Sequence, residues 1–213
     1  MNLGQRVLRI GRELVISGAV AGTWGNVSAW DEEKEGFWIT PSGMDYLSLQ
    51  EEDLVLLNIR GEIREGSRRP SSELPLHLEI YRQRPDVKGV IHTHSVHASA
   101  HAAVRLAIPP LVEDLAMIVG GEVPVSAYQP PGSRELALAA VKALGSGNAV
   151  LLPNHGLVGV GTSPEEAWKV CRVCEKGAQI HVFSRLLGQP VLFSDEEVRR
   201  MREAYVGDYG QPT

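Results

Sequence analysis

The strongest constraint on the fold is the alternation of short apolar runs with amphipathic helical stretches along the sequence. Short runs rich in β-branched residues are typical of strands, and an apolar repeat every three or four residues is typical of a helix. The sequence predicts strands at about 37–40, 54–59, 87–93, 122–127, 149–152 and 156–160. It predicts helices at about 3–17, 73–82, 96–106, 133–144, 163–187 and from 194 onward. This mixture indicates a layered α/β fold in which helices cover a sheet, and the short gap between the last two strands indicates antiparallel pairing there.

Length and composition exclude several classes of protein. The 213 residues are expected to form one domain over 1–213. A net charge of −5 argues against a general nucleic-acid binder, and no apolar run approaches the ~20 residues of a membrane span. Charges scattered through the first helix are not typical of a signal peptide. Cys171 and Cys174 give no disulfide framework and are expected to pack in the core. We therefore expect a cytoplasmic protein with neither a nucleic-acid nor a membrane partner.

Two histidines lie two residues apart at the end of a predicted strand, in Val90-Ile91-His92-Thr93-His94. Side chains two apart on a strand point to the same face, so both imidazoles can reach one metal ion. The spacing alone is equally consistent with two polar residues at a strand end. A third histidine, His155, follows the apolar run 149–153, and three imidazoles with one open position are typical of a catalytic zinc site. Gly156 beside it allows close backbone approach.

The other four histidines have simpler interpretations. His97 and His101 are four residues apart among alanines on a predicted helix, which favours packing or support of the metal ligands. His77 and His181 lie within amphipathic helices, where histidines are more often surface or core residues than ligands.

Three turns are rich in small polar residues and backbone donors: Gly25-Asn26, Ser42-Gly43 and Ser71-Ser72. The third begins a predicted helix, where free N–H groups and the helix dipole favour an anion. Together the turns are candidates to hold a phosphate, although each alone is equally an ordinary turn or cap. Glu73 follows the serine pair. Its carboxylate is a candidate metal ligand or proton acceptor, and otherwise simply stabilises the start of the helix.

Five stretches together resemble the class II aldolase/adducin family, and within it most closely the L-fuculose-1-phosphate aldolases. They occur in the order and spacing of the family and extend over nearly the whole chain. The stretches are Thr23-Trp24-Gly25-Asn26-Val27-Ser28, Ile39-Thr40-Pro41-Ser42-Gly43, Pro70-Ser71-Ser72-Glu73, His92-Thr93-His94-Ser95-Val96-His97 and Asn154-His155-Gly156-Leu157.

The resemblance implies a single three-layer α/β/α domain with a largely antiparallel central sheet. It also implies a homotetramer with active sites at the subunit interfaces. One Zn²⁺ per subunit would be held by His92, His94 and His155. Glu73 would be the catalytic acid/base, and a fourth zinc ligand when substrate is absent. The substrate phosphate would be bound by Asn26, Ser42, Gly43, Ser71 and Ser72.

The implied reaction is the reversible cleavage of a ketose 1-phosphate, such as L-fuculose 1-phosphate, to dihydroxyacetone phosphate and an aldehyde such as L-lactaldehyde. The aldolases use a tyrosine to move the proton at the aldehyde oxygen. Here the corresponding segment, 110–115, carries Glu113 and Asp114 instead. Tyr209 matches the tail tyrosine of the family and is expected in this role, with Tyr205, Glu113 and Asp114 as alternatives.

The family offers three other functions. A ribulose-phosphate 4-epimerase usually carries aspartate where this chain has Glu73. Glu113 or Asp114 could supply the acidic base that a methylthioribulose-phosphate dehydratase uses, so this function stays an alternative. A non-catalytic adducin-like scaffold lacks the metal histidines that this chain has. Glu73 and the three histidines therefore favour a metal-dependent aldehyde-lyase acting on a sugar phosphate.

Overall fold

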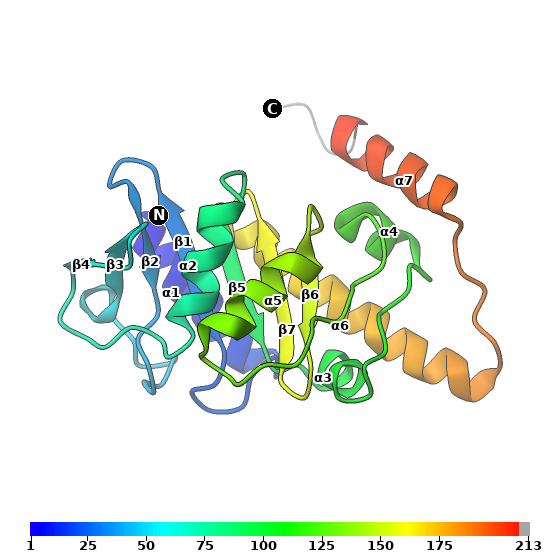
Figure 1. Ribbon diagram of the computed structural model, residues 1–213, viewed down its shortest axis with the longest axis horizontal. Helices are drawn as coiled ribbons and strands as arrows, with labels where there is room; N and C mark the ends of the chain where they lie inside the picture. The colour runs from blue at the N-terminus through cyan, green and yellow to red at the C-terminus, as the bar shows by residue number, and fades with distance from the viewer. Residues whose placement is uncertain (209–213) are drawn as a thin grey trace.

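A seven-stranded sheet forms the centre of the computed structural model, which describes residues 1–208 (Figure 1). Its strand order is β4-β3-β2-β1-β5-β7-β6, and every neighbouring pair is antiparallel. The strands are β1 (Asn26–Asp31), β2 (Gly36–Ile39), β3 (Val55–Asn58), β4 (Ile63–Glu65), β5 (Gly89–Thr93), β6 (Ala149–Leu152) and β7 (Gly156–Gly161).

Helices cover both faces of this sheet. The helices are α1 (Leu3–Ile16), α2 (Leu74–Gln83), α3 (Val96–Ala103), α4 (Glu113–Val119), α5 (Arg134–Leu144), α6 (Pro164–Leu187) and α7 (Asp195–Asp208), with a short 3₁₀ turn at Glu51–Asp53. One face packs against α1 and α6, and the other packs against α2 and α5. Figure 1 shows α7 reaching back over α4 after the long helix α6 ends. This is the predicted three-layer α/β/α fold with an antiparallel sheet.

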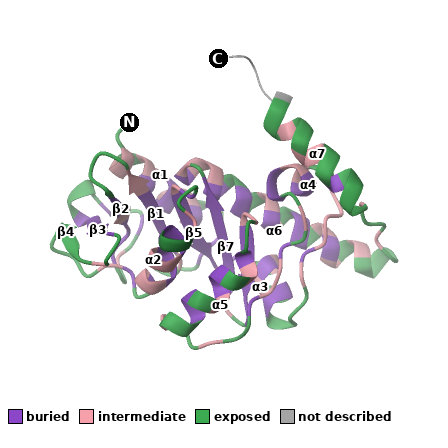
Figure 2. Cartoon of the chain, turned by 45° about the horizontal axis from the view of Figure 1, so that its top comes forward, coloured by how far each residue is buried: buried purple, intermediate pink, exposed green. Residues whose placement is uncertain are grey.

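Every residue of β5 and of β6 is buried, because helices cover both faces of the sheet (Figure 2). Val90 of β5 packs with α2 and α5, whereas the next residue, Ile91, packs with α1 and α6. Val150 and Leu151 of β6 are divided between the two cores in the same way. Alternation of side chains along a strand therefore builds one core on each side of the sheet.

Residues 122–127 are not a strand of the sheet, so this prediction was wrong. The segment makes only isolated bridges, Ile108 with Val123 and Val125 with Leu151. Pro124 interrupts it and has no N–H to donate to a ladder. The structure also contains β1, β4 and α4, none of which was predicted as a strand or helix, and β4 and α4 are short. Among the described residues, no helix is long and apolar enough to cross a bilayer.

Candidate metal and active site

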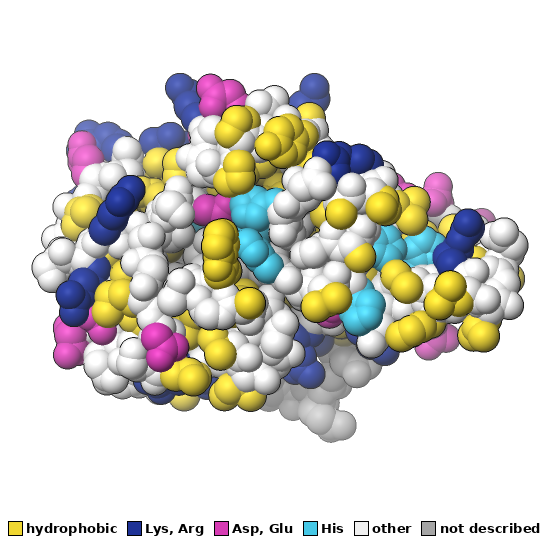
Figure 3. All heavy atoms as spheres, turned by 90° about the horizontal axis from the view of Figure 1, so that it is seen from below, with side chains coloured by type: hydrophobic (Ala, Val, Ile, Leu, Met, Phe, Trp, Pro, Cys, Tyr) yellow, Lys and Arg dark blue, Asp and Glu magenta, His cyan; other side chains and the backbone are white. Residues whose placement is uncertain are grey.

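The three predicted metal histidines meet at one edge of the sheet. His92 lies near the end of β5 and His94 just after it, while His155 lies in the turn between β6 and β7. The Nε2 atom of His92 is 2.8 Å from Nε2 of His94 and 3.2 Å from Nε2 of His155. Pairing of β5 with β7 brings these segments together. Figure 3 shows histidine side chains beside an acidic side chain in a hollow on this face.

The protonation pattern suits a cation between the rings. His92 is fully buried, and its Nδ1 donates to the backbone oxygen of Leu157 at 3.0 Å, which leaves Nε2 as the ring nitrogen that faces the cluster. Burial and the neighbouring histidines lower the pKa of His94 to about 3 and that of His155 to about 4. Both rings are therefore neutral at pH 7, so they too can offer a nitrogen lone pair to a metal.

Glu73 faces the same point from the position immediately before α2. Its carboxylate oxygens lie 3.2 Å from Nε2 of His92 and 3.3 Å from Nε2 of His155. Asn26 donates its Nδ2 to Oε2 of Glu73 at 3.0 Å. Burial, the largest influence, raises the pKa of Glu73, but the two histidines and the Asn26 hydrogen bond outweigh it and hold the pKa below its usual value.

Two buried polar atoms of these residues have no hydrogen-bond partner in the part of the chain that the structure describes. They are Oε1 of Glu73 and Nδ1 of His155. A buried carboxylate oxygen beside several bare imidazole nitrogens is costly unless a cation compensates it. Ligands of a tetrahedral zinc ion lie about 3.3 Å apart, close to the separations in the cluster. We conclude that the donors fit a divalent metal, with Glu73 able to complete the set beside His92, His94 and His155.

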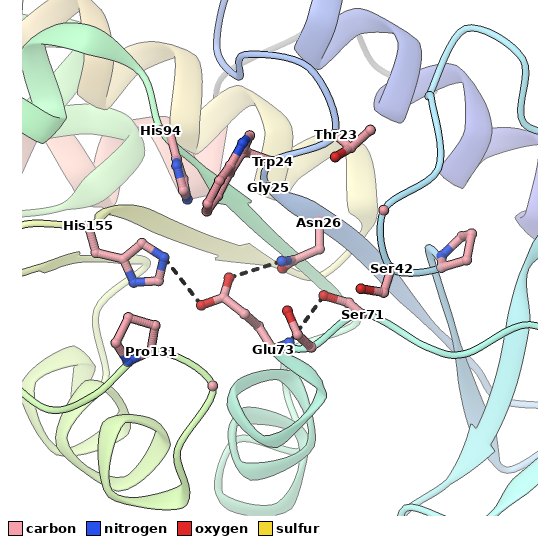
Figure 4. Close-up of a pocket in the computed structure, with 14 residues that line it drawn as sticks. Thr23, Trp24, Gly25, Asn26, Ser42, Ser71, Glu73, His94, Pro131 and His155 are labelled. Atoms are coloured by element: carbon pink, nitrogen blue, oxygen red, sulfur yellow. Dashed lines mark hydrogen bonds and ion pairs between the residues drawn. The ribbon is translucent and has the colours of Figure 1, made fainter.

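A cavity of about 270 Å³ opens over these groups (Figure 4). The residues predicted to bind phosphate all line it: Asn26, Ser42, Gly43, Ser71 and Ser72. His94, His155 and Glu73 line it as well. The sequence-distant turns are therefore on one wall, next to the candidate metal site.

Backbone hydrogen bonds hold two of these turns together. Ser42 donates its N–H to the oxygen of Arg69 at 3.0 Å, and Ser71 donates its N–H to the oxygen of Thr40 at 3.1 Å. The N–H groups of Gly43 and Ser72 donate to no group among residues 1–208. Both are therefore available to an anion in the cavity.

The predicted second proton donors are not in this cavity as described. Asp114 pairs with Lys176 at 2.5 Å, and Glu113 begins α4. The Tyr205 hydroxyl accepts from Nζ of Lys169. The lining residues that the structure describes include none of these groups. Tyr209 lies outside the described residues.

Three further histidines, His97, His101 and His181, and the two cysteines are not among the residues that line the cavity. Nδ1 of His97 donates to the carboxylate of Glu175 at 2.7 Å. Nε2 of His101 is 2.8 Å from Nδ1 of His181. Cys171 and Cys174 are buried and free, as expected for core residues.

Sequence analysis missed His77 and Ser28, which lie directly behind the site. His77 is 0 % exposed and hydrogen-bonds to Asn26. A signal was available, because Glu73 and His77 are four apart on one helix and Asn26 and Ser28 are two apart on one strand. Each pair therefore shares a face.

Comparison with known proteins agrees with this geometry. Residues 5–182 match the family described as Class II Aldolase and Adducin N-terminal domain. A 5-deoxy-D-ribulose 1-phosphate aldolase of Bacillus thuringiensis is 36% identical over 207 residues, which covers 97% of this chain and 96% of the relative. An L-fuculose phosphate aldolase of Escherichia coli is 32% identical over 204 residues, covering 95% of this chain and 94% of the relative.

Solved structures point the same way. An L-fuculose 1-phosphate aldolase superposes with a TM-score of 0.93 at 36% identity, covering 96% of each chain. The L-fuculose-1-phosphate aldolase of Thermus thermophilus superposes with a TM-score of 0.78 at 31% identity, covering 89% of this chain and 98% of that one. The chain therefore belongs to the class II aldolase and adducin family and is an enzyme of its lyase branch.

Proposed function

We propose that this protein is a zinc-dependent aldolase that reversibly cleaves a ketose 1-phosphate, L-fuculose 1-phosphate or a similar sugar. The products would be dihydroxyacetone phosphate and an aldehyde such as L-lactaldehyde. One observation carries this proposal: three imidazoles and the buried Glu73 carboxylate converge at a cavity that is also lined by three donor-rich turns. Relatives named for L-fuculose phosphate and 5-deoxy-D-ribulose 1-phosphate support a substrate of this class.

The histidine cluster would hold one zinc ion per subunit. His92, His94 and His155 are the proposed ligands, and Glu73 is the proposed fourth ligand when no substrate is bound. When bound, the ion supplies Lewis acidity toward the carbonyl group of the ketose.

Glu73 is the proposed acid/base. It would carry a proton to and from the dihydroxyacetone phosphate carbon at which the C–C bond breaks. Its carboxylate is largely buried at the cavity wall, and Asn26 donates to Oε2, while Oε1 has no hydrogen-bond partner among the described residues. The group is therefore ionised, oriented and able to accept a proton.

The turns around the cavity are the proposed phosphate site. Backbone N–H groups of Gly43 and Ser72, with hydroxyl groups of Ser42 and Ser71, can donate to phosphate oxygens without a basic side chain. Asn26 belongs to the same wall. An acidic protein can bind an anionic substrate in this way.

A second proton donor would act at the aldehyde oxygen. The described lining residues contain no tyrosine, and we propose Tyr209 for this role, with Tyr205, Glu113 and Asp114 as alternatives. We further propose that residues 1–213 form one domain and that the protein is a cytoplasmic homotetramer with its active sites at subunit interfaces.

A product assay tests the proposed reaction. The purified, zinc-loaded protein is offered the 1-phosphates of L-fuculose, L-rhamnulose, 5-deoxyribulose and methylthioribulose, and ribulose 5-phosphate. Release of dihydroxyacetone phosphate from a ketose 1-phosphate is the expected result. An epimerised or dehydrated product without it would instead identify an epimerase or a dehydratase.

A further inference from the structure

A continuous chain of buried hydrogen bonds runs behind Glu73. Asn26 donates to Glu73 at 3.0 Å (Figure 4), and Oδ1 of the same amide is hydrogen-bonded to Nε2 of His77. Nδ1 of His77 lies 2.6 Å from the hydroxyl of Ser28, and that hydroxyl lies 2.8 Å from the hydroxyl of Tyr81. All five side chains are buried, so water does not compete for these contacts.

The number of available protons determines which group donates and which accepts in each hydrogen bond of this series. The Asn26 carbonyl can only accept, so His77 must carry a proton on Nε2. His77 is neutral at pH 7, because burial lowers its pKa to about 3 although the Glu73 charge opposes this. Its Nδ1 therefore accepts from Ser28, whose only proton is used there, and Tyr81 donates to Ser28.

The Glu73 carboxylate, which can only accept, requires the Asn26 amide to present its NH₂ group. If the amide were turned over, its carbonyl oxygen would face the Glu73 carboxylate across a gap of about 3.0 Å. Two acceptors would then oppose each other. The N–H donated by His77 holds the amide in the orientation that presents a donor to Glu73.

We propose that His77 is a positioning residue for Glu73. It acts through Asn26 and is itself held by Ser28 and Tyr81. This inference rests on the proposed function, in which Glu73 moves the proton. Among the described residues, His77 does not line the cavity, and its side chain hydrogen-bonds to Asn26 and Ser28 rather than to a candidate metal ligand. Its effect is therefore on the orientation of the carboxylate.

Substitution of His77 tests the proposal with kcat, KM and zinc content as separate readings. For His77→Leu we expect kcat to fall by about 100-fold, since a misplaced catalytic group costs about that much. KM and zinc content should stay within about threefold of the wild type. The kcat of His77→Gln should be at least about tenfold higher than that of His77→Leu, because the glutamine amide N–H can replace the Nε2 donor.

His181→Leu is the matched control, because it also removes a buried imidazole but lies on α6 and pairs with His101. Its kcat should stay within about twofold of the wild type. The proposal is overturned if His77→Leu keeps its kcat, changes only KM, or loses zinc. If the wild-type protein cleaves none of the sugar phosphates, the proposed function fails instead.

Nitrogen-15 NMR of the histidine rings tests the direction of the chain without any change to the fold. In the wild-type protein the His77 ring, assigned by its absence in His77→Gln, should carry its proton on Nε2 and have a bare Nδ1 at pH 7. A proton on Nδ1 would reverse the chain and overturn the proposal.

Discussion

At the scale of single residues, the site depends on one buried carboxylate. Glu73 is 7 % exposed, and burial alone would raise its pKa. The surrounding histidines and the Asn26 amide outweigh burial and lower the pKa below its usual value. A carboxylate that stays ionised in a buried place can accept a proton and can also ligate a metal. These two roles predict different effects of replacing the carboxylate by the neutral amide of glutamine, one on kcat and one on zinc binding.

Glu73→Gln should lower kcat by about 10²- to 10⁴-fold, because the amide cannot accept a proton. Zinc should remain bound through His92, His94 and His155. Steady-state kinetics and metal analysis of the same preparation measure both quantities. Glu79→Gln, on α2 beside Arg82, is the control and should keep its kcat. Unchanged cleavage by Glu73→Gln would remove the assigned role.

Most residues of the candidate site were predictable at this scale, because clustered histidines and donor-rich turns have recognisable local spacing. Strand alternation predicts that His92 and His94 point to the same side, and His155 then made a metal site the favoured interpretation. His77 was not identified, because its function depends on a contact with β1, and the sequence does not reveal which strand lies against α2.

At the scale of secondary-structure elements, the metal site depends on how closely β5 and β7 approach. A Cβ atom added at Gly156 would lie 2.1 Å from the Thr93 oxygen and 3.2 Å from both Cε1 of His92 and Cδ2 of His94. Only glycine fits between these strands. This confirms the expectation that a glycine beside His155 serves close backbone approach.

Gly156→Ala should lower the free energy of unfolding by about 1–3 kcal/mol, because the extra methyl forces the strands apart. Zinc affinity should fall too, since His92 and His94 must shift. Urea unfolding and a competitive zinc titration measure the two effects. Gly121→Ala has no atom within 4 Å of the added Cβ and should change neither. A variant at Gly156 as stable as the wild type would contradict this account.

A second contact between elements is sensitive to acid. Glu165 in the first turn of α6 pairs with Arg6 at 2.5 Å and with Arg9 at 2.8 Å, which ties α6 to α1. The Arg6 hydrogen bond is the main reason that the pKa of Glu165 is lowered to about 2, against a smaller opposing effect of burial. The carboxylate therefore stabilises the fold above its unfolded pKa of about 4.5 and ceases to do so as pH falls toward 2.

Glu165→Gln should accordingly be less stable than the wild type at pH 7, and this difference should shrink at pH 3. Urea unfolding at the two pH values measures it. Glu33→Gln, at an exposed position in a turn, provides a control that should show little difference at either pH. An equal destabilisation by Glu165→Gln at both pH values would contradict the ion-pair explanation.

At the scale of the whole molecule, the layered fold was predictable because hydrophobic periodicity distinguishes strands from helices. The strand order was not, because it depends on long-range pairing such as β1 with β5. Residues 122–127 show the limit of local reasoning: apolar character indicated a strand, but Pro124 prevents a full ladder. The fold matters for function because β1, β5, β7 and α2 each deliver part of one site.

We propose that this site cleaves a C–C bond with the help of a metal held by three histidines. The most direct test of this proposal is the release of dihydroxyacetone phosphate from a ketose 1-phosphate by chelator-treated protein before and after zinc is restored. The account predicts no release from the metal-free protein and full recovery at one zinc ion per chain. Undiminished release after the metal has been removed would contradict it.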